Sequence, residues 1–380
     1  MPQLALVLVH YRTPELLPGA IEALRRDLGE AADDNEWVVV DNGCDAAGVE
    51  LLRSLPVTVV EPGRNLGFAG GVNLGVERTS APVVVVLNPD VLVLPGCLGA
   101  LTERLAAGAA VAGPRFFWDR GRRLLLPPPE RRTRADELWA LLADRGPHWA
   151  RRARRRWRRH ARDHWCAAGP LRSIHLSGAL LALRRDAFAR IGPFDEGYRL
   201  YFEETDWLAR LERQGFFGEH VPAAAAVHLY ARSAARERAA TEWFEDSRRR
   251  FQRRRYGAWF ELLWRALARR RVPGPAAEGA DLSLHIGAGE ERRWVELGPG
   301  SRGFPAAAER IDAASRGWRP PPEVEHRLEP GRYRLQLVAA DGRELASRQI
   351  VLASEGGGRR AGRDDGGEAG RAATPSAPIQ

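Results

Sequence analysis

Acidic and amide side chains stand directly after short apolar runs in the first hundred residues. Asp41 follows one such run, and Asn88 and Asp90 flank a proline after another. A carboxylate at the end of a buried strand can accept hydrogen bonds from a nucleobase or ribose. It can also hold a divalent cation that bridges two phosphates, because hard cations select oxygen ligands. Ordinary turns, which favour Asp, Asn, Pro and Gly, are the alternative interpretation.

A glycine-rich segment, residues 64–75, follows the third apolar run and opens a helical pattern. Gly67 and Gly71 let the backbone approach a ligand closely, while Asn65 and Asn73 supply amide donors and acceptors. The free N–H groups of a helix start favour phosphate. A dinucleotide-binding loop is the rival interpretation. That motif needs G-x-G-x-x-G after the first strand and an acid about 20 residues later, and neither condition holds here.

The stretch 191–210 holds five acids among apolar and aromatic neighbours. If Glu204 opens a helix, the helix dipole favours its ionised form, and such a base could take a proton from an acceptor hydroxyl. Asp206 can pair with Arg210 at i,i+4. We therefore predict Glu204 as the general base. Asp195, Glu203, Asp206 and Arg210 are expected to bind the acceptor or support the site.

His228 ends the apolar run 221–227 and could add an imidazole ligand to a cation held by Asp90. A structural histidine is the alternative, since a lone histidine in an apolar setting more often packs than ligates.

Five apolar runs predict the strands that position these side chains: residues 4–9, 36–41, 57–61, 83–87 and 109–113. Helical patterns such as 14–27 and 70–78 separate them. Continuous apolar runs without alternation are typical of strands buried on both faces. The sequence therefore predicts an open, mostly parallel α/β sheet, whose ligands bind beyond the carboxyl ends of its strands.

The composition excludes several classes of protein. The chain has 380 residues, a formal net charge of +9, and only arginine among its 58 basic residues. Its three cysteines are far apart and include no CxxC pair, so neither a disulfide framework nor a thiolate zinc site is indicated, and a reduced, cytoplasmic compartment fits. No signal peptide or membrane span is visible.

Arginine and tryptophan gather in two segments, 120–165 and 232–271, which hold seven of the twelve tryptophans. A solvated helix face, an interfacial helix on anionic lipid, and a nucleic-acid surface are all compatible with that composition. Further on, period-two alternation in 281–297 and 333–352, with a turn signal at 340–342, predicts a small antiparallel β domain.

In this order the motifs resemble family 2 glycosyltransferases, and in particular the rhamnosyltransferase-like branch. The resemblance covers roughly residues 3–235 and rests on Asp41, 65–75, 88–90, 177–179, 192–196 and 203–206. The chain departs from the pattern twice. Asn88 replaces the first acid of the DxD-like motif, as is common in this branch, and Glu204 stands where the branch usually has Asp.

The resemblance implies a GT-A fold, a nucleotide-diphospho-sugar donor, Mg²⁺ or Mn²⁺, and inverting transfer to a hydroxyl. Asp41 would read the base, Asp90 would bind the metal with His228, and Glu204 would be the general base. The remaining residues expected to bind the donor are Asn65, Gly67, Gly71, Asn73, Asn88, Gly178 and Ala179.

We therefore expect a metal-dependent enzyme that moves a sugar, rhamnose by analogy with that branch, to a cell-surface polysaccharide or a polyprenyl-linked glycan. It would lie at the inner face of the cell membrane, held peripherally by anionic lipid, with no nucleic acid as partner. A nucleotidyltransferase and a basic scaffold or nucleic-acid-binding protein are the alternatives. The expected parts are a catalytic domain at 1–235 with the insertion 120–165, a basic amphipathic helical segment at 236–271, a linker at 272–280, a β domain at 281–353, and a disordered tail at 354–380.

Overall fold

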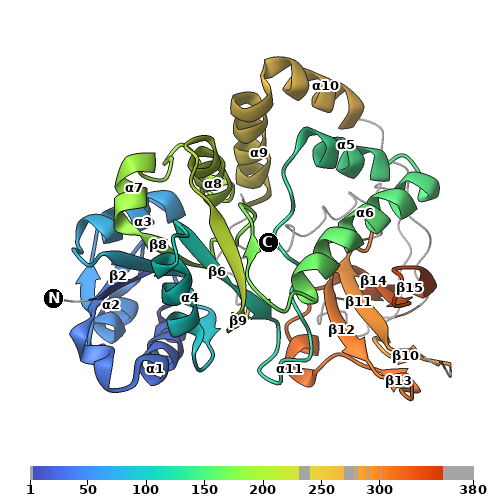
Figure 1. The fold of residues 1–380 in the computed structure, drawn as a ribbon, viewed down its shortest axis with the longest axis horizontal. Helices are drawn as coiled ribbons and strands as arrows, with labels where there is room; N and C mark the ends of the chain where they lie inside the picture. Colours follow the sequence, from blue (N-terminus) through green and yellow to red (C-terminus); the bar gives the residue numbers. More distant parts are fainter. Residues whose placement is uncertain are drawn as a thin grey trace, which may run out of the picture.

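The computed structural model describes residues 3–230, 240–268, 279, 281–287, 289, 291–300 and 302–353. The predicted tail at 354–380, most of the predicted linker and the first residues of the predicted basic helical segment lie outside this range. The described chain contains two principal sheets, one built from the N-terminal half and one from the C-terminal part (Figure 1).

The larger sheet has nine strands, in the order β3-β2-β1-β4-β8-β6-β9-β5, and β7 pairs with β9. All five strands expected in the first 115 residues are present in it. Its strands are β1 (Leu4–His10), β2 (Glu36–Asp41), β3 (Thr58–Val60), β4 (Val83–Leu87), β5 (Val91–Val93), β6 (Val111–Phe117), β7 (Leu171–Arg172), β8 (Leu180–Arg184) and β9 (Gly218–His228).

The expectation of an α/β fold is confirmed, and the sheet is mixed. Strands β3, β2, β1 and β4 run parallel. The direction reverses at β8, which pairs antiparallel with both β4 and β6. Strands β6 and β9 are parallel to each other. A parallel arrangement therefore holds for the N-terminal half, where helices connect successive strands, and not for the sheet as a whole.

Alternate side chains of β1 enter two separate hydrophobic cores. Leu4, Leu6 and Leu8 pack on one face of the sheet with helices α1 (Leu17–Leu28), α2 (Ala46–Arg53) and α4 (Cys97–Ala106). The intervening Ala5 and Val7 pack on the other face with α3 (Gly67–Glu77), α7 (Arg185–Ile191) and α8 (Glu203–Arg213). Because side chains alternate along a strand, a strand covered on both faces must be apolar throughout.

The predicted β domain is present as a four-stranded antiparallel sheet in the order β12-β11-β14-β15. Residues 340–342 form the expected turn between β14 and β15, where Gly342 N–H donates to the Ala339 carbonyl at 3.0 Å. The elements of this part are β10 (Leu284–His285), β11 (Arg293–Pro299), β12 (Ala307–Ile311), β13 (Gly317–Trp318), α11 (Pro322–Glu325), β14 (Gly331–Val338) and β15 (Glu344–Leu352).

The first arginine-rich segment contains helices α5 (Arg134–Ala143) and α6 (Pro147–Trp165), and α6 packs against the C-terminal sheet. Trp157 and Trp165 are buried there, with Trp165 stacked on Trp294 at a centroid distance of 5.4 Å. Arg158 is buried as well and donates to the Glu296 carboxylate at 2.9 Å. These side chains therefore join two parts of the molecule, so the expectation that they face solvent or lipid is wrong for this face of α6.

The second arginine-rich segment contains helices α9 (Ala240–Tyr256) and α10 (Ala258–Ala268), which pack by aromatic side chains. Phe244, Phe251, Tyr256 and Phe260 share a cluster with Phe202, which directly precedes α8. Among the described helices, none combines the length and the apolar character that a bilayer span requires.

Candidate active site

The ends of four elements meet at one edge of the large sheet. The turn after β4 is tied to the loop before β8, because Asn88 N–H donates to the Ala179 carbonyl at 2.9 Å. It is also tied to the end of β9, because Leu229 N–H donates to the Asp90 carbonyl at 2.9 Å. The sequence-predicted residues Asn88, Asp90, Ala179 and His228 are thereby brought together.

Asp90 and His228 lie side by side in this cluster. The Asp90 carboxylate oxygen is 3.3 Å from Nε2 of His228, and both side chains are buried. His228 stacks on Tyr230 with ring centroids 4.2 Å apart. A carboxylate oxygen and an imidazole nitrogen at this separation can ligate one divalent cation together, so the two residues fit the Mg²⁺ or Mn²⁺ that the sequence led us to expect.

Helix α8 begins against the same cluster, preceded by a strained backbone. Tyr201 and Phe202 have φ values of 63° and 71°, a region that side chains other than glycine seldom adopt. This bend brings Glu204 beside the loop before β8: a Cβ atom at Gly178 would lie 3.2 Å from Cγ of Glu204. Strain held at such a position is typical of functional sites.

Glu203 and Glu204 are both buried, and burial raises the pKa of each carboxyl group. Burial, followed by the neighbouring Glu204 charge, raises the pKa of Glu203 well above its ordinary value. Burial also raises the pKa of Glu204, but backbone N–H groups at the helix start and Arg132 oppose the rise. Arg132 therefore opposes the effect of burial at Glu204 and favours the ionised form of that carboxyl group.

Asp206 and Arg210 form the expected i,i+4 pair, with Nε of Arg210 2.9 Å from the carboxylate. Arg210 also donates to the carbonyls of Ile191 and Pro193 at 3.0 and 2.7 Å. The pair therefore fixes α8 to the preceding loop. Asp195 likewise pairs with a helix, since Arg250 of α9 lies 3.0 Å from its carboxylate.

Packing against neighbouring elements and internal hydrogen bonds hold the glycine-rich segment in place. Gly67 has φ +73° at the start of α3, and a Cβ at Gly71 would lie 2.5 Å from a methyl of Val9. Asn65 accepts from Gly67 N–H at 2.8 Å. Asn73 is buried, and its amide contacts Phe194 and Glu196, so its contacts indicate a structural clamp and not the donor contact we expected.

Asp41 ends β2 and lies directly beside His10, the last residue of β1. Nε2 of His10 is 3.4 Å from the Asp41 carboxylate, which also accepts from Gly43 N–H at 2.8 Å. The next residue, Asn42, donates to the Gly67 carbonyl at 3.0 Å. Asp41 therefore lies at the same edge as the start of α3, as a residue that reads a nucleobase would require.

Three residues that sequence reasoning did not select also contribute to this edge. Tyr201 and Tyr230 are half-buried near Asp90. Desolvation raises the pKa of both phenols, followed by the charges of Glu203, Glu204 and Asp90 at Tyr201 and by that of Asp90 at Tyr230. Arg132, from the arginine-rich segment, lies over the Phe202 ring at 4.9 Å and acts electrostatically on Glu204. The aromatic residues around 198–202 were the available signal for Tyr201; Arg132 had none, because its neighbours on the chain are also arginines.

A small cavity of about 30 Å³ adjoins His228, lined by residues of β6, α6, the loop before β8, and β9. His164, His175 and His220 line it together with three consecutive prolines, 127–129. The Nε2 atoms of His164 and His220 are buried and have no hydrogen-bond partner in the described part of the chain. The cavity therefore offers polar atoms that a bound molecule could satisfy.

The buried histidines predict acid sensitivity. Burial lowers the pKa of His160 and His220 to about 3 and that of His175 to about 4. The unfolded chain therefore binds more protons below about pH 6.5, and stability falls as the pH drops from there toward 4. At pH 5 each such histidine costs about 2 kcal/mol relative to pH 7. Urea unfolding at several pH values measures this.

Two variants make that measurement specific. His220→Gln should flatten the pH dependence, whereas the same change at the exposed His148 should leave it unaltered. A free energy of unfolding that does not change between pH 7 and pH 5 would contradict the prediction.

Comparison with known proteins shows which family the N-terminal part of the chain resembles. Residues 5–188 match the description Glycosyl transferase family 2. These residues form a glycosyl transferase family 2 domain. The match covers β1 to α7, including Asp41, the glycine-rich segment and Asp90. The resemblance inferred from the motifs is confirmed, and sugar transfer is favoured over nucleotidyl transfer.

Relatives of the family 2 domain include the N-acetylglucosaminyl-diphospho-decaprenol L-rhamnosyltransferase of Mycobacterium tuberculosis, strains CDC 1551 and H37Rv. It is 28% identical over 272 residues, which are 67% of this chain and 85% of the relative. The low-salt glycan biosynthesis hexosyltransferase Agl10 of Haloferax volcanii is 22% identical over 257 residues, 66% of this chain and 75% of that protein.

Among solved structures, the mannosyltransferase PcManGT from Pyrobaculum calidifontis, in complex with GDP-Man and Mn²⁺, aligns with a TM-score of 0.42 and 15% identity over 70% of this chain and 74% of that chain. GalNAc-T7 with UDP, GalNAc and Mn²⁺ aligns with a TM-score of 0.46 and 14% identity over 93% and 72%.

Proposed function

We propose that this glycosyltransferase is an inverting, metal-dependent enzyme that moves a sugar, rhamnose in the first instance, from a nucleotide-diphospho-sugar to a hydroxyl of a lipid-linked glycan. One observation carries the proposal. The Asp90 and His228 pair and the buried Glu204 lie around the same loop, residues 177–179, because Asn88 bonds to Ala179 and Glu204 packs on Gly178.

Glu204 has the properties of a general base. Burial raises its pKa, which makes its carboxylate a stronger base toward the proton of an acceptor hydroxyl. The acceptor oxygen would attack the anomeric carbon as Glu204 takes its proton, and the nucleoside diphosphate would leave on the opposite side of the sugar. Single displacement of this kind inverts the anomeric configuration.

Asp90 and His228 would hold the divalent cation. When bound, the cation supplies positive charge that offsets the charge developing on the leaving diphosphate. Asp41, at the end of β2, would accept hydrogen bonds from the nucleobase, and the start of α3 would face the phosphates. Mg²⁺ and Mn²⁺ are both suited to this oxygen-and-imidazole pair.

The acceptor assignment follows from a relative. The Mycobacterium tuberculosis relative is named for an N-acetylglucosaminyl-diphospho-decaprenol acceptor. In the present protein the acceptor's reacting sugar would bind at the edge where Glu204 and the Asp90 and His228 pair lie. A polyprenyl chain would then have to remain in a bilayer at the inner face of the cell membrane.

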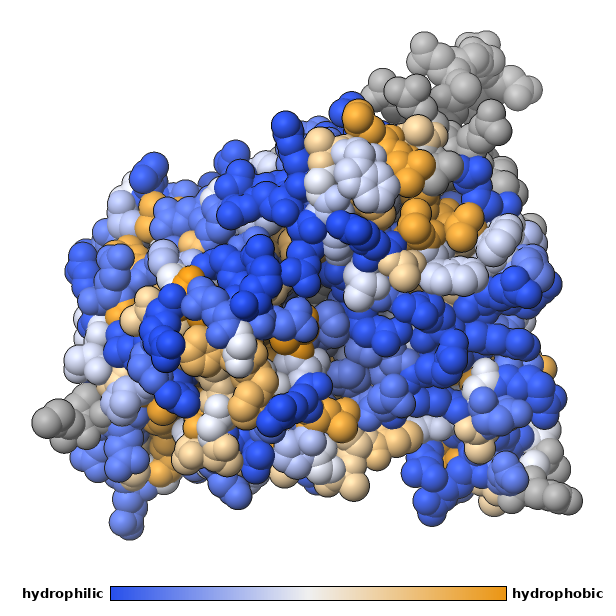
Figure 2. Space-filling view, turned by 45° about the horizontal axis from the view of Figure 1, so that its top comes forward, coloured by the Kyte–Doolittle hydropathy of each residue, from blue (hydrophilic) through white to orange (hydrophobic). Residues whose placement is uncertain are grey.

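Helix α10 carries a surface suited to that membrane. Trp259, Leu262 and Leu263, which share one face at i, i+3 and i+4, are 56%, 64% and 39% exposed. Figure 2 shows apolar side chains gathered over this part of the molecule. Arg254 and Arg265 are exposed nearby on α9 and α10. An apolar stripe flanked by arginines is typical of helices that lie in an anionic lipid interface.

The membrane proposal predicts flotation with anionic liposomes at low salt, fading as salt screens the arginines. The double variant Trp259→Ser, Leu262→Ser should stay at the bottom of the gradient, because the apolar stripe is lost. Leu345→Ser, which changes an exposed leucine of the C-terminal sheet (42% exposed), is the matched control and should float like the unaltered protein. Equal flotation of all three proteins would assign membrane binding to another surface.

A thermal-shift screen of nucleotide-diphospho-sugars tests the function itself. A donor present at 100 times its Kd should stabilise the folded protein by about 2.7 kcal/mol, because it binds only the folded state. The shift should appear with Mg²⁺ or Mn²⁺ and disappear with EDTA. If no nucleotide-diphospho-sugar shifts the melting temperature with either metal, the proposed donor class is wrong.

A further inference from the structure

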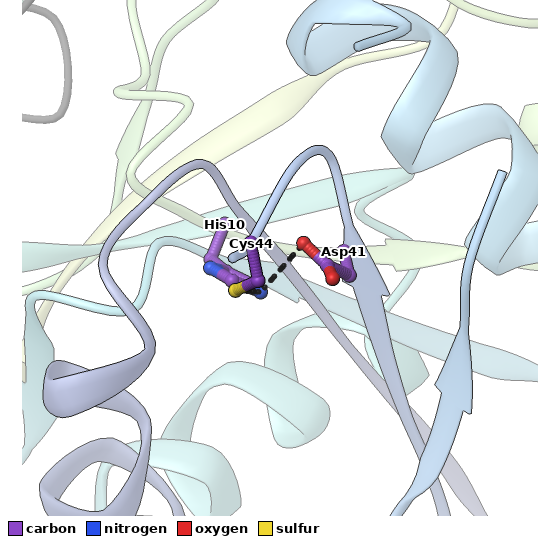
Figure 3. A group of neighbouring side chains, drawn as sticks. All are labelled: His10, Asp41 and Cys44. Atoms are coloured by element: carbon purple, nitrogen blue, oxygen red, sulfur yellow. Dashed lines mark hydrogen bonds and ion pairs between the residues drawn. The ribbon is translucent and has the colours of Figure 1, made fainter. Parts of the chain in front are cut away.

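Three side chains with different ligand chemistry converge at the ends of β1 and β2. His10 ends β1, Asp41 ends β2 beside it, and Cys44 lies in the turn that leads to α2 (Figure 3). Their ligand atoms all lie within 4.8 Å of one another. We propose that His10, Asp41 and Cys44 form a site for a thiophilic divalent cation of the Zn²⁺ class, separate from the Asp90 and His228 pair.

The distances match a tetrahedral centre. Zinc bonds of about 2.0–2.1 Å to nitrogen, 2.0–2.2 Å to oxygen and 2.3 Å to sulfur give tetrahedral edges of about 3.4 Å between N and O and about 3.6 Å between N and S. Nε2 of His10 is 3.4 Å from the Asp41 carboxylate and 3.8 Å from Sγ of Cys44. The two separations that involve His10 therefore lie within about 0.2 Å of these edges, and the carboxylate and the sulfur lie within 4.8 Å of each other.

The turn holds the thiol in this position. Asp41 accepts from Gly43 N–H at 2.8 Å, and Asp45 caps α2 by accepting from Gly48 N–H at 2.8 Å. A Cβ at Gly48 would lie 2.8 Å from Sγ of Cys44, so the absence of a side chain there leaves room for the sulfur. Cys44 is half-buried, while His10 and Asp41 are buried.

The imidazole of His10 is oriented for this role. Nε2 is the ring nitrogen that faces both the Asp41 carboxylate and Cys44 Sγ. Nδ1 is buried with no hydrogen-bond partner in the described part of the chain, so the ring proton can reside there and leave Nε2 free for a cation. The charges of Asp41, Asp45 and Glu15 act on Cys44 and would attract a dication to it.

The two sites have different ligand sets and should therefore prefer different metals. Thiolate with imidazole and a carboxylate selects Zn²⁺ or Co²⁺, whereas Asp90 with His228 accepts the harder Mg²⁺ and Mn²⁺. Binding releases the Cys44 proton to solvent, and no oxidation or reduction occurs. Because the ion would occupy the Asp41 carboxylate, Zn²⁺ and the donor would compete. This consequence rests on the proposed function, while the site itself does not.

Cobalt reports the site directly. Metal-free protein titrated with Co²⁺ should develop a thiolate-to-cobalt charge-transfer band, which added Zn²⁺ abolishes. Cys44→Ser should lose the band, and Asp41→Asn should weaken it while keeping the thiol. Cys166→Ser, which changes the exposed cysteine, and His228→Ala, which removes the other candidate ligand, should both retain it. Circular dichroism confirms that each variant is folded.

Two results would overturn the site: no thiolate band in the unaltered protein, or the same band in Cys44→Ser. A second titration addresses competition. Zn²⁺ should raise the apparent donor Kd of the unaltered protein and not that of Cys44→Ser. If the cobalt band behaves as expected but Zn²⁺ leaves the donor Kd unchanged, the metal site stands and the role of Asp41 toward the donor is wrong.

Discussion

Glutamine in place of Glu204 is expected to lower kcat by about 10²–10⁴-fold while leaving the donor Kd unchanged. The amide keeps the size of the side chain and its packing on Gly178, but it cannot accept a proton from the acceptor. A loss confined to the chemical step separates a general base from a binding residue. Steady-state kinetics with a synthetic acceptor, together with donor calorimetry, measure both quantities.

The neighbouring acids supply the controls for this experiment. Asp206→Asn should lower stability more than turnover, because Asp206 pairs with Arg210 and lies 3.4 Å from the Tyr198 hydroxyl. Glu203→Gln should retain most activity, since Glu204, and not Glu203, lies against Gly178 beside the metal pair. Near-normal kcat in Glu204→Gln with a large loss in Glu203→Gln would move the base by one residue.

Alanine in place of Asp90 is expected to abolish metal-dependent donor binding. The variant removes the only carboxylate placed beside His228 at this edge among the described residues, and an imidazole alone is a poor ligand for Mg²⁺. Calorimetry of donor binding with and without Mn²⁺ measures the effect. The metal-linked part of the affinity should vanish, while any metal-independent binding remains.

Asp312→Ala is the matched control for Asp90→Ala, since Asp312 is an exposed carboxylate on the C-terminal part of the chain. It should bind donor and metal like the unaltered protein. His228→Ala should weaken the metal dependence without removing it, because the carboxylate remains. An Asp90→Ala protein that still binds donor more tightly with Mn²⁺ than without it would place the cation elsewhere.

The sequence by itself determined the N-terminal sheet and the chain positions of the site. Runs of apolar residues such as 83–87 are typical of strands covered on both faces, so the sequence predicted where these strands end. Asp41, Asp90 and Glu204 were predicted because short-range rules apply to them: a carboxylate after a strand, or an acid at a helix start. The Asp206 and Arg210 pair followed from the helical repeat alone.

Only the tertiary structure decided which arginines and tryptophans of the basic segments are buried. Arg158 and Trp157 of α6 pack against β11 because Glu296 and Trp294 lie across from the helix, more than 100 residues away in the chain. The sequence shows a basic helix with an apolar stripe at Ala153, Trp157, Ala161 and Trp165, and gives no information about the surface that covers this stripe. Likewise, only the tertiary structure shows that the apolar stripe on α10 is exposed, whereas the stripe on α6 is covered.

The mixed ligand group at His10, Asp41 and Cys44 illustrates the same limit. Metal sites are recognised in sequence by close spacing of their ligands, and the three cysteines lack it. Parallel pairing of β1 with β2 places residues 10 and 41 side by side although 31 positions separate them, and the following turn adds residue 44. Local patterns therefore determined what each residue could do, while strand pairing decided which residues could act together.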